Sequence, residues 1–202
     1  MALETASVHA EKRDGVLLLS LVDPGGLPRL SRTLVGAIHR QILEARAAKD
    51  ILAIVITGTA KAFAVGANIA ELVALTPPEA VAFAQLGQAL TDEVESMSKP
   101  VIAAIRGYCI GGGFDLAMSC HMRVASTDAL FRSPGGALGI VTDWGGTQRL
   151  PRLVGRARAL ELFVANRTLT AEEALRWKLV SRVVAPADVV ATADTLAHKT
   201  LR

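Results

Sequence analysis

The sequence predicts an α/β fold, in which buried strands alternate with helices. Two continuous apolar runs, residues 51–56 and 101–105, are typical of strands that are covered on both faces. Segments with the helical spacing of apolar residues precede both runs, and this alternation indicates layered helices and strands. Hydrophobic residues make up 51% of the 202 residues and aromatic residues only 4%, which favours helices and buried strands over a β-sandwich.

The first part of the chain predicts a hairpin followed by a helix. Residues 7–12 and 16–22 have strand character and flank Asp14-Gly15, a favoured two-residue turn. Residues 25–28 form a loop. Ser31 can then cap a helix with apolar residues on one face. These residues are Leu34, Val35, Ile38, Ile42 and Leu43. The strand at residues 51–56 follows this helix.

Two loops in the middle of the chain follow predicted strands. Residues 57–68 are small and glycine-bearing, and they come at the carboxyl end of a strand, where α/β proteins bind ligands. A short helix over residues 69–75 and a longer one from residue 78 to about residue 97 come next. The strand at residues 101–105 leads to three glycines, residues 111–113, and a further helix. Such a turn lets a bare backbone approach a ligand, and the first N–H groups of the helix have no intrahelical partner.

The last part of the chain continues the α/β pattern without a linker or a low-complexity segment. A capping box at residues 170–173 begins a helix that ends near residue 178. The other predicted elements are short strands at 122–125 and 130–132, a loop at 133–146, helices at 146–154 and 156–165, a strand at 179–184 and a helix at 187–200. We therefore expect one core domain, residues 1–185, and the start of a C-terminal helical region, residues 186–202.

Composition and charge exclude several classes of protein. The net charge is +3 and the basic residues are scattered, which argues against a nucleic-acid groove. Cys109 and Cys120 form neither a disulfide framework nor a metal-ligand pattern, so we expect free buried thiols in a reducing compartment. No apolar stretch is long enough to cross a bilayer, and residues 12–22 lack the cleavage site of a secretory signal. These features predict a soluble cytoplasmic protein without a metal, a nucleic-acid partner or a membrane partner.

The two glycine-bearing loops suggest a catalytic arrangement. Residues 64–68 and 111–113 could each present backbone N–H groups, and two such donors that converge on one carbonyl oxygen form an oxyanion hole. Loss of one donor typically raises the barrier by about 3 kcal/mol. Asp115, at a helix start, and Asp143, in a glycine-rich loop, are candidate bases. Aspartate is also common at helix N-termini for purely structural reasons, and the residues alone leave both roles open.

Three segments resemble those of one enzyme family. They read KAFAVGANIAEL at 61–72, KPVIAAIRGYCIGGGFDLAMSC at 99–120, and GGTQRLPRLVGRARALEL at 145–162 followed by LTAEEALRWKLVSRVV. On these motifs, from about residue 17 to residue 184, the chain is similar to the enoyl-CoA hydratase/isomerase (crotonase) superfamily. The resemblance implies a crotonase-like spiral of ββα units with flanking helices and a shortened C-terminal helical region. It also implies an acyl-CoA thioester substrate, a role in fatty acid metabolism and no cofactor besides the coenzyme A of the substrate.

The resemblance assigns roles to individual positions. By motif position, Ala67 and Gly112 would be the two oxyanion donors. The residues expected at the substrate and its coenzyme A moiety are Leu27, Arg29, Ala67, Asn68, Ile69 and Gly112. Five aromatic residues are candidates for the acyl pocket, although core packing is an equally good interpretation of each. These are Phe63, Tyr108, Phe114, Phe131 and Trp144.

The carboxylates depart from the pattern of a hydratase in this family. The first of its two catalytic glutamates falls at Asp115 and the second at Gly135, which cannot transfer a proton. Asp143 is similar in position to the catalytic aspartate of dienoyl-CoA isomerases and of ring-epoxide phenylacetyl-CoA isomerases. One base that removes a proton and returns it elsewhere is enough for a double-bond shift. We therefore predict an isomerase with Asp143 as proton carrier and Asp115 assisting.

Two other functions remain open at this point. A 2-enoyl-CoA hydratase (a lyase) could use Asp115 with water, and a catalytically weak homologue could bind acyl-CoA without turnover. The resemblance further implies a homotrimer or hexamer. However, the chain ends at Arg202, near the first of the terminal helices that build such assemblies in the family. A short natural form, a truncated gene and a fragment are all compatible with this length.

Overall fold

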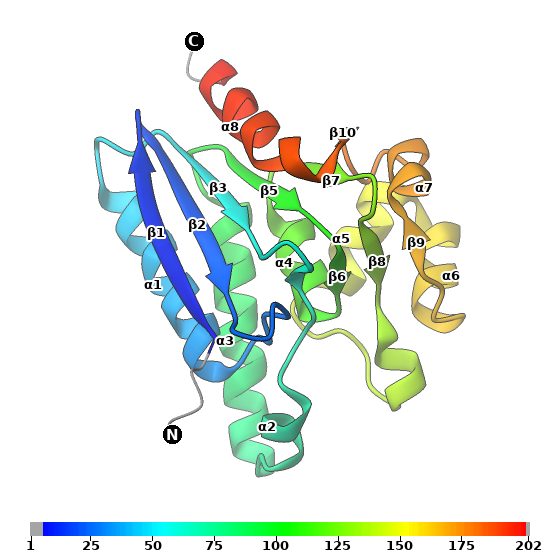
Figure 1. The fold of residues 1–202 in the computed structure, drawn as a ribbon. Coiled ribbons are helices and arrows are strands. Elements are labelled where there is room, and N and C mark those ends of the chain that lie inside the picture. The colour runs from blue at the N-terminus through cyan, green and yellow to red at the C-terminus, as the bar shows by residue number, and fades with distance from the viewer. Residues whose placement is uncertain (1–5, 201–202) are drawn as a thin grey trace.

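The chain forms two sheets, which are shown in Figure 1; the computed structural model describes residues 6–200. The larger sheet has the order β1(Ser7–Arg13), β2(Val16–Val22), β3(Ala53–Thr57), β5(Val101–Ile105), β7(Met122–Ser126), β10(Arg182–Val184). The smaller sheet has the order β4(Ala62–Ala64), β6(Tyr108–Ile110), β8(Leu130–Arg132), β9(Leu169–Thr170). All neighbouring strands are parallel except for the antiparallel pairs β1–β2 and β8–β9.

The connectivity is the predicted spiral of ββα units. Strands β3, β5 and β7 lie in the larger sheet, and each is followed by a strand of the smaller sheet, β4, β6 or β8, before the next helices. The helices are α1(Arg32–Ala47), α2(Ile69–Val73), α3(Pro77–Glu95), α4(Gly112–Ser119), α5(Gly146–Val154), α6(Arg156–Val164), α7(Ala171–Arg176) and α8(Val189–Lys199), with 3-10 turns η1(Pro134–Leu138) and η2(Pro186–Asp188).

Helices cover both faces of the larger sheet. On one face, side chains of β2 such as Leu19 pack in a single core with Ile38 of α1 and Leu90 of α3. On the other face, the sheet packs against α8, in a separate core that includes Val55 and Ala193. All five residues of β3 and of β5 are buried. This double coverage explains why both strands are continuous apolar runs in the sequence.

Local signals in the sequence match the observed ends of several elements. The predicted hairpin turns at Asp14 and Gly15, which adopt φ angles of 46° and 83°. Ser31 caps α1 by accepting a hydrogen bond from the N–H of Leu34 at 3.2 Å. At α7, the Thr170 hydroxyl accepts from the N–H of Glu173, and the Glu173 carboxylate accepts from the N–H of Thr170. This reciprocal pair is the predicted capping box.

Some boundaries differ from the sequence prediction. Residues 57–68, expected to be a loop, contain the three-residue strand β4, which forms because it pairs with β6 far along the chain. Residues 133–146 contain η1 in place of a plain loop. Leu43, expected on the buried face of α1, is 45% exposed. The predicted strand at 179–184 is shorter, since only Arg182–Val184 pair in the sheet.

The two cysteines are free and buried, as predicted. Burial raises the pKa of the Cys120 thiol to about 12, and it also raises the pKa of Cys109. Both side chains are therefore neutral thiols at physiological pH, which suits packing in the core. Within residues 6–200, no helix combines the length and the apolar character that are needed to cross a membrane.

Candidate active site

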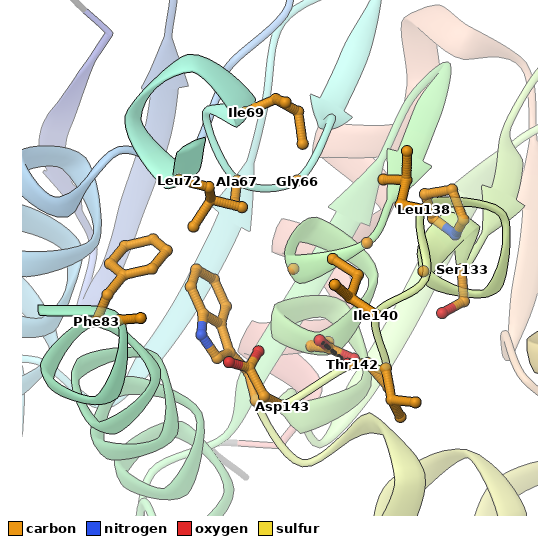
Figure 2. Close-up of a pocket in the computed structure, with 18 of the residues that line it drawn as sticks. Gly66, Ala67, Ile69, Leu72, Phe83, Ser133, Leu138, Ile140, Thr142 and Asp143 are labelled. Atoms are coloured by element: carbon orange, nitrogen blue, oxygen red, sulfur yellow. Dashed lines mark hydrogen bonds between the residues drawn. The ribbon is translucent and has the colours of Figure 1, made fainter. Parts of the chain in front are cut away.

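A cavity of about 410 Å³ opens where the smaller sheet meets α2, α3, α4 and the segment between η1 and α5. Figure 2 shows Gly66, Ala67 and Leu72 along one side of it and Leu138 and Ile140 along the other. The lining is mainly apolar, with a few polar side chains. These polar residues are Asp115, Ser133, Thr142 and Asp143. A concave apolar pocket with a few converging polar groups is the usual form of a small-molecule site.

The two predicted glycine-bearing loops meet at this cavity. A Cβ atom on Gly66 would lie 3.2 Å from the carbonyl oxygen of Ile110 and 3.6 Å from the nitrogen of Gly112. Gly111 adopts a φ of 54°, which side-chain-bearing residues rarely accept, and turns the chain into α4. Within the described part of the chain, the N–H groups of Ala67 and Gly112 donate to no other group. Both residues line the cavity, so these N–H groups are available to a ligand.

Asp115 projects into the cavity from the first turn of α4 and is almost fully buried. Its Oδ2 accepts a hydrogen bond from the hydroxyl of Thr142. Burial raises the pKa of Asp115 to about 7, and the negative charge of Asp143 acts in the same direction, whereas the Thr142 hydrogen bond and the charge of Arg149 lower it. The carboxyl group is therefore poised between its neutral and ionised forms near neutral pH.

Asp143 lines the same cavity from the segment before α5 and is more exposed than Asp115. Partial burial raises the pKa of its carboxyl group, and a hydrogen bond from its own backbone N–H opposes that rise. The described part of the cavity thus holds two carboxyl groups in different environments. Such a difference separates two acids by role, because the more buried one keeps its proton more readily.

The backbone of Asp143 and Trp144 is anchored to α3. Gln88 Nε2 donates to the carbonyl oxygen of Asp143 at 2.9 Å, and Thr91 Oγ1 donates to that of Trp144 at 3.0 Å. Arg149 Nη1 donates a second bond to the Trp144 carbonyl at 2.7 Å. The buried guanidinium of Arg149 is itself paired with two carboxylates of α3, those of Asp92 and Glu95. These contacts fix the backbone that carries the Asp143 side chain at the cavity.

The segment around Gly135 leaves no room for a glutamate. Gly135 lines the cavity in η1, and its carbonyl oxygen accepts a hydrogen bond from the N–H of Ile140 at 3.0 Å. A Cβ atom at this position would lie only 2.6 Å from the carbonyl oxygen of Ile140. The backbone of Ile140 therefore packs directly against Gly135, and any side chain at position 135 would require the backbone to move.

The residues expected at coenzyme A divide into two groups. Ala67, Ile69 and Gly112 line the cavity. Leu27, Arg29 and Asn68 do not, although the segment that carries the first two runs beside the loop after β4. The N–H of Val65 donates to the Pro28 carbonyl at 3.0 Å, and that of Leu30 donates to the Gly66 carbonyl at 2.8 Å. The Asn68 side chain caps α2 by accepting from the N–H of Ala70 at 3.2 Å.

Of the five aromatic candidates for the acyl pocket, Trp144 lines the cavity. Phe63, Phe114 and Phe131 are buried in the core, where the last two rings pack 5.6 Å apart. Tyr108 is 46% exposed and does not line the cavity either. For the three phenylalanines the alternative of core packing is therefore the correct one, as is common for apolar side chains next to a motif. Tyr108 fits neither interpretation.

Several cavity residues were not found from the sequence. Phe83, on the buried face of α3, reaches the cavity, as do Leu72 of α2, Leu75 of the connection to α3 and Ala80 of α3. Helical spacing identifies a buried face but not what that face contacts. Thr142 could have drawn notice only as a polar neighbour of Asp143, because its partner Asp115 precedes it by 27 residues.

Comparisons with known proteins agree with this geometry. A family model described as enoyl-CoA hydratase/isomerase matches residues 11–202. The short-chain-enoyl-CoA hydratase of Clostridium acetobutylicum is 37% identical over 198 residues, which are 98% of this chain and 76% of that protein. The probable enoyl-CoA hydratase echA8 of Mycobacterium tuberculosis is 39% identical over 205 residues, covering 98% of this chain and 77% of its own. A solved structure of an enoyl-CoA hydratase subunit from Geobacillus kaustophilus superposes with a TM-score of 0.89 at 35% identity, covering 97% of this chain and 76% of its own.

Proposed function

Because the chain belongs to the enoyl-CoA hydratase/isomerase family, we propose that it is an acyl-CoA enzyme that shifts a carbon–carbon double bond in the acyl chain of its substrate. One observation favours isomerisation over hydration. Asp143 lies in the cavity, whereas the position of a hydratase's second glutamate is occupied by Gly135, where an added Cβ atom would clash with the carbonyl oxygen of Ile140. A double-bond shift needs one base, which removes a proton from one carbon and returns it to another.

In this proposal the thioester carbonyl accepts hydrogen bonds from the N–H groups of Ala67 and Gly112. These donors stabilise the enolate that forms when C2 loses a proton, and such preorganised donors supply several kcal/mol of stabilisation, on the order of 3 kcal/mol for each one. The Asp143 carboxylate takes the proton from C2. It then returns the proton to C4 of a 3-enoyl thioester, or to C6 of a 3,5-dienoyl thioester, while the double bond moves into conjugation with the carbonyl.

Asp115 assists through its charge state. Its pKa of about 7 leaves much of the population protonated at neutral pH. A neutral Asp115 keeps a second negative charge away from the enolate, and like charges a few ångströms apart repel strongly in a water-poor site. The Thr142 hydroxyl holds the Asp115 carboxyl group in one orientation.

Hydration of a 2-enoyl thioester is the second candidate activity. Proteins at 37–39% identity to this chain are described as enoyl-CoA hydratases. In this alternative, ionised Asp115 orients a water molecule whose oxygen adds to C3, while C2 gains a proton. Syn hydration is commonly shared by two carboxylates, and Gly135 offers none, so we expect slow hydration at most.

The test uses three thioesters, crotonyl-CoA, 3-hexenoyl-CoA and 3,5-octadienoyl-CoA, with the wild type and matched Asp→Asn variants. Asp143→Asn should lower isomerisation by about 100-fold or more, the usual contribution of a general base, and Asp115→Asn should lower it less. The exposed Asp188, remote from the cavity residues, provides the control variant Asp188→Asn. Efficient hydration of crotonyl-CoA by Asp143→Asn would contradict the isomerase. Binding of the three thioesters without turnover would favour the catalytically weak homologue.

By family membership we also propose that the chain assembles as a homotrimer or as a pair of trimers. Apolar side chains that remain exposed, among them Leu160 and Val164 of α6, give a physical reason for association. Multi-angle light scattering at micromolar concentration should report a mass of three or six chains. A monomeric mass across the accessible concentration range would refute this assembly.

A further inference from the structure

We propose that Trp144, backed by Phe83, closes the inner end of the acyl pocket and restricts the substrate to short and medium acyl chains. The proposal rests on the function proposed above for the cavity and names the class of thioester that fits it. It assigns chain-length selection to one side chain, next to the residue that carries the proton.

The two aromatic side chains form a packed pair at the inner wall. The exposed fraction is 2% for Trp144 and 5% for Phe83, yet both line the cavity. Their ring centroids lie 5.4 Å apart with an interplanar angle of 71°, an edge-to-face contact. Such contacts add to the energy of apolar burial. Because the Trp144 carbonyl is also bonded to Thr91 and Arg149, the backbone that carries the indole is fixed.

Two glycines make room for the indole. A Cβ atom on Gly87 of α3 would lie 2.0 Å from Trp144 Cε2, and one on Gly112 of α4 would lie 2.7 Å from Trp144 Cζ3. The ring therefore occupies the space between the two helices in direct contact with both backbones. It cannot retreat toward α3 without a clash, so a substrate does not easily displace it.

The contact with Gly112 places the indole beside the reacting part of the substrate. The N–H of Gly112 is one of the two proposed donors to the thioester carbonyl. An acyl chain that continues from this carbonyl therefore starts against the face or edge of the indole. We take the chain to extend along the apolar wall that includes Leu72, Leu75 and Phe83.

The exposure of the lining residues distinguishes the buried aromatic wall from the rim of the cavity. The opposite rim is open to solvent, since Ile69, Leu138 and Ile140 are each more than half exposed. A chain that passes this rim meets the buried aromatic pair. The volume of about 410 Å³ is near the low end of the range of about 300–1,000 Å³ that is typical of ligand pockets. A short acyl chain fits this space, and a long one meets the indole.

The experiment measures binding and turnover along a chain-length series. Saturated butanoyl-, octanoyl- and dodecanoyl-CoA are titrated calorimetrically, with free CoA as reference, and the matching enoyl thioesters are assayed for kcat/KM. For the wild type, both affinity and kcat/KM should fall by about tenfold or more between the octanoyl and dodecanoyl members. One methylene too many in an apolar pocket already costs about tenfold. Trp144→Ala should bind the dodecanoyl thioester at least as well as the octanoyl one. The ratio of the two affinities in Trp144→Phe should lie between those of the wild type and Trp144→Ala.

A second variant acts on the Trp144 side chain from the side of α3. Gly87→Ala adds a methyl group where the indole now lies, so it should push the ring into the cavity and shift the preference further toward butanoyl-CoA. The matched control is Gly36→Ala in α1, where an added Cβ meets no atom within 4 Å. Its chain-length profile should equal that of the wild type, and thermal unfolding confirms that each variant is folded.

The outcomes separate this inference from the proposed activity. If the wild type binds all members of the series equally well, or if folded Trp144→Ala keeps the wild-type profile, the inference is overturned. If no enoyl thioester is turned over but the binding profile shifts in Trp144→Ala as expected, the inference stands and the proposed activity fails. Binding no tighter than that of free CoA along the whole series would overturn both.

Discussion

Thr142 controls the charge of Asp115 at the scale of a single hydrogen bond. Its hydroxyl donates to Asp115 Oδ2 and stabilises the ionised form, against the burial that raises the pKa to about 7. Thr142→Val should therefore raise the pKa of Asp115 by about 1 unit or more, since a hydrogen bond to a charged group contributes about 1.5–3 kcal/mol. A carboxyl-carbon NMR titration measures this pKa directly. Thr142→Ser keeps the hydroxyl and should return the value to that of the wild type; an unchanged pKa in the valine variant would contradict the assignment.

Burial of Asp115 also has a consequence for stability. Its pKa is about 7 in the folded chain, against a reference value of 3.8, so the folded state binds the proton more tightly. The contribution of this group to the free energy of unfolding is therefore fully present below about pH 4 and is lost as the pH rises through 7. Asp115→Asn cannot ionise. It should match the wild type near pH 4 and exceed it at pH 8 by about 2–4 kcal/mol, as expected for a shift of about 3 units.

Urea unfolding of Asp115→Asn and of the wild type at the two pH values measures this difference. Asp188→Asn, at an exposed position outside the cavity, is measured alongside as the matched control for the loss of one carboxylate. An equal difference between Asp115→Asn and the wild type at both pH values would show that the effect comes from packing and not from the charge. The result bears on function as well, because residues at active sites often reduce the stability of the fold.

At the scale of elements, α3 supports the segment that carries Asp143 and Trp144. Thr91 is fully buried, and its hydroxyl is one of two donors to the Trp144 carbonyl, next to Asp143. Thr91→Val keeps the shape and removes the donor, so the backbone that carries the Asp143 side chain should be held less firmly. We expect kcat to fall by about tenfold or more with little change in KM, because small displacements of a catalytic group cost rate more than binding.

Steady-state kinetics of the proposed isomerisation test this support, with Thr91→Ser as the variant that keeps the hydroxyl. A stability loss of about 1 kcal/mol is expected for the lost hydrogen bond, and assays well below the unfolding temperature remove its influence on rate. An unchanged kcat in a folded Thr91→Val protein would mean that Gln88 and Arg149 hold the segment without it.

The elements also show what the sequence could and could not predict. Strands β3 and β5 were predictable because double coverage imposes continuous apolar runs, and the two glycine loops were predictable because their composition suits the ends of buried strands. Strand β4 was not, since three residues carry too little pattern and the strand depends on its pairing with β6. The clamp of Gln88, Thr91 and Arg149 was also missed, because its contacts join residues more than 50 positions apart or act on backbone carbonyls.

At the scale of the whole molecule, the spiral explains why the two glycine loops meet. Strands β4 and β6 are parallel neighbours in the smaller sheet, so the segments that follow them leave from the same edge. This arrangement brings Gly66 against Gly111 and Gly112, and both α2 and α4 contribute residues to the lining of the cavity. The site therefore depends on the smaller sheet and on α3, whereas α8 covers the face of the larger sheet that points away from α1 and α3.

This division predicts that stability and catalysis can be changed separately. Ala193 of α8 is fully buried against the larger sheet, in the core that contains Val55 and Val124, and no residue of α8 lines the cavity. Ala193→Leu overfills that contact and should lower the free energy of unfolding by about 1–3 kcal/mol. The exposed Ala191 on the same helix gives the matched control, because Ala191→Leu adds the same side chain toward solvent and should change stability by less than about 0.5 kcal/mol. Urea unfolding measures the stability of both variants, and kcat/KM is measured at a temperature where both are folded. A drop in kcat/KM for Ala193→Leu alone would mean that the α8 face and the cavity are coupled through the sheet.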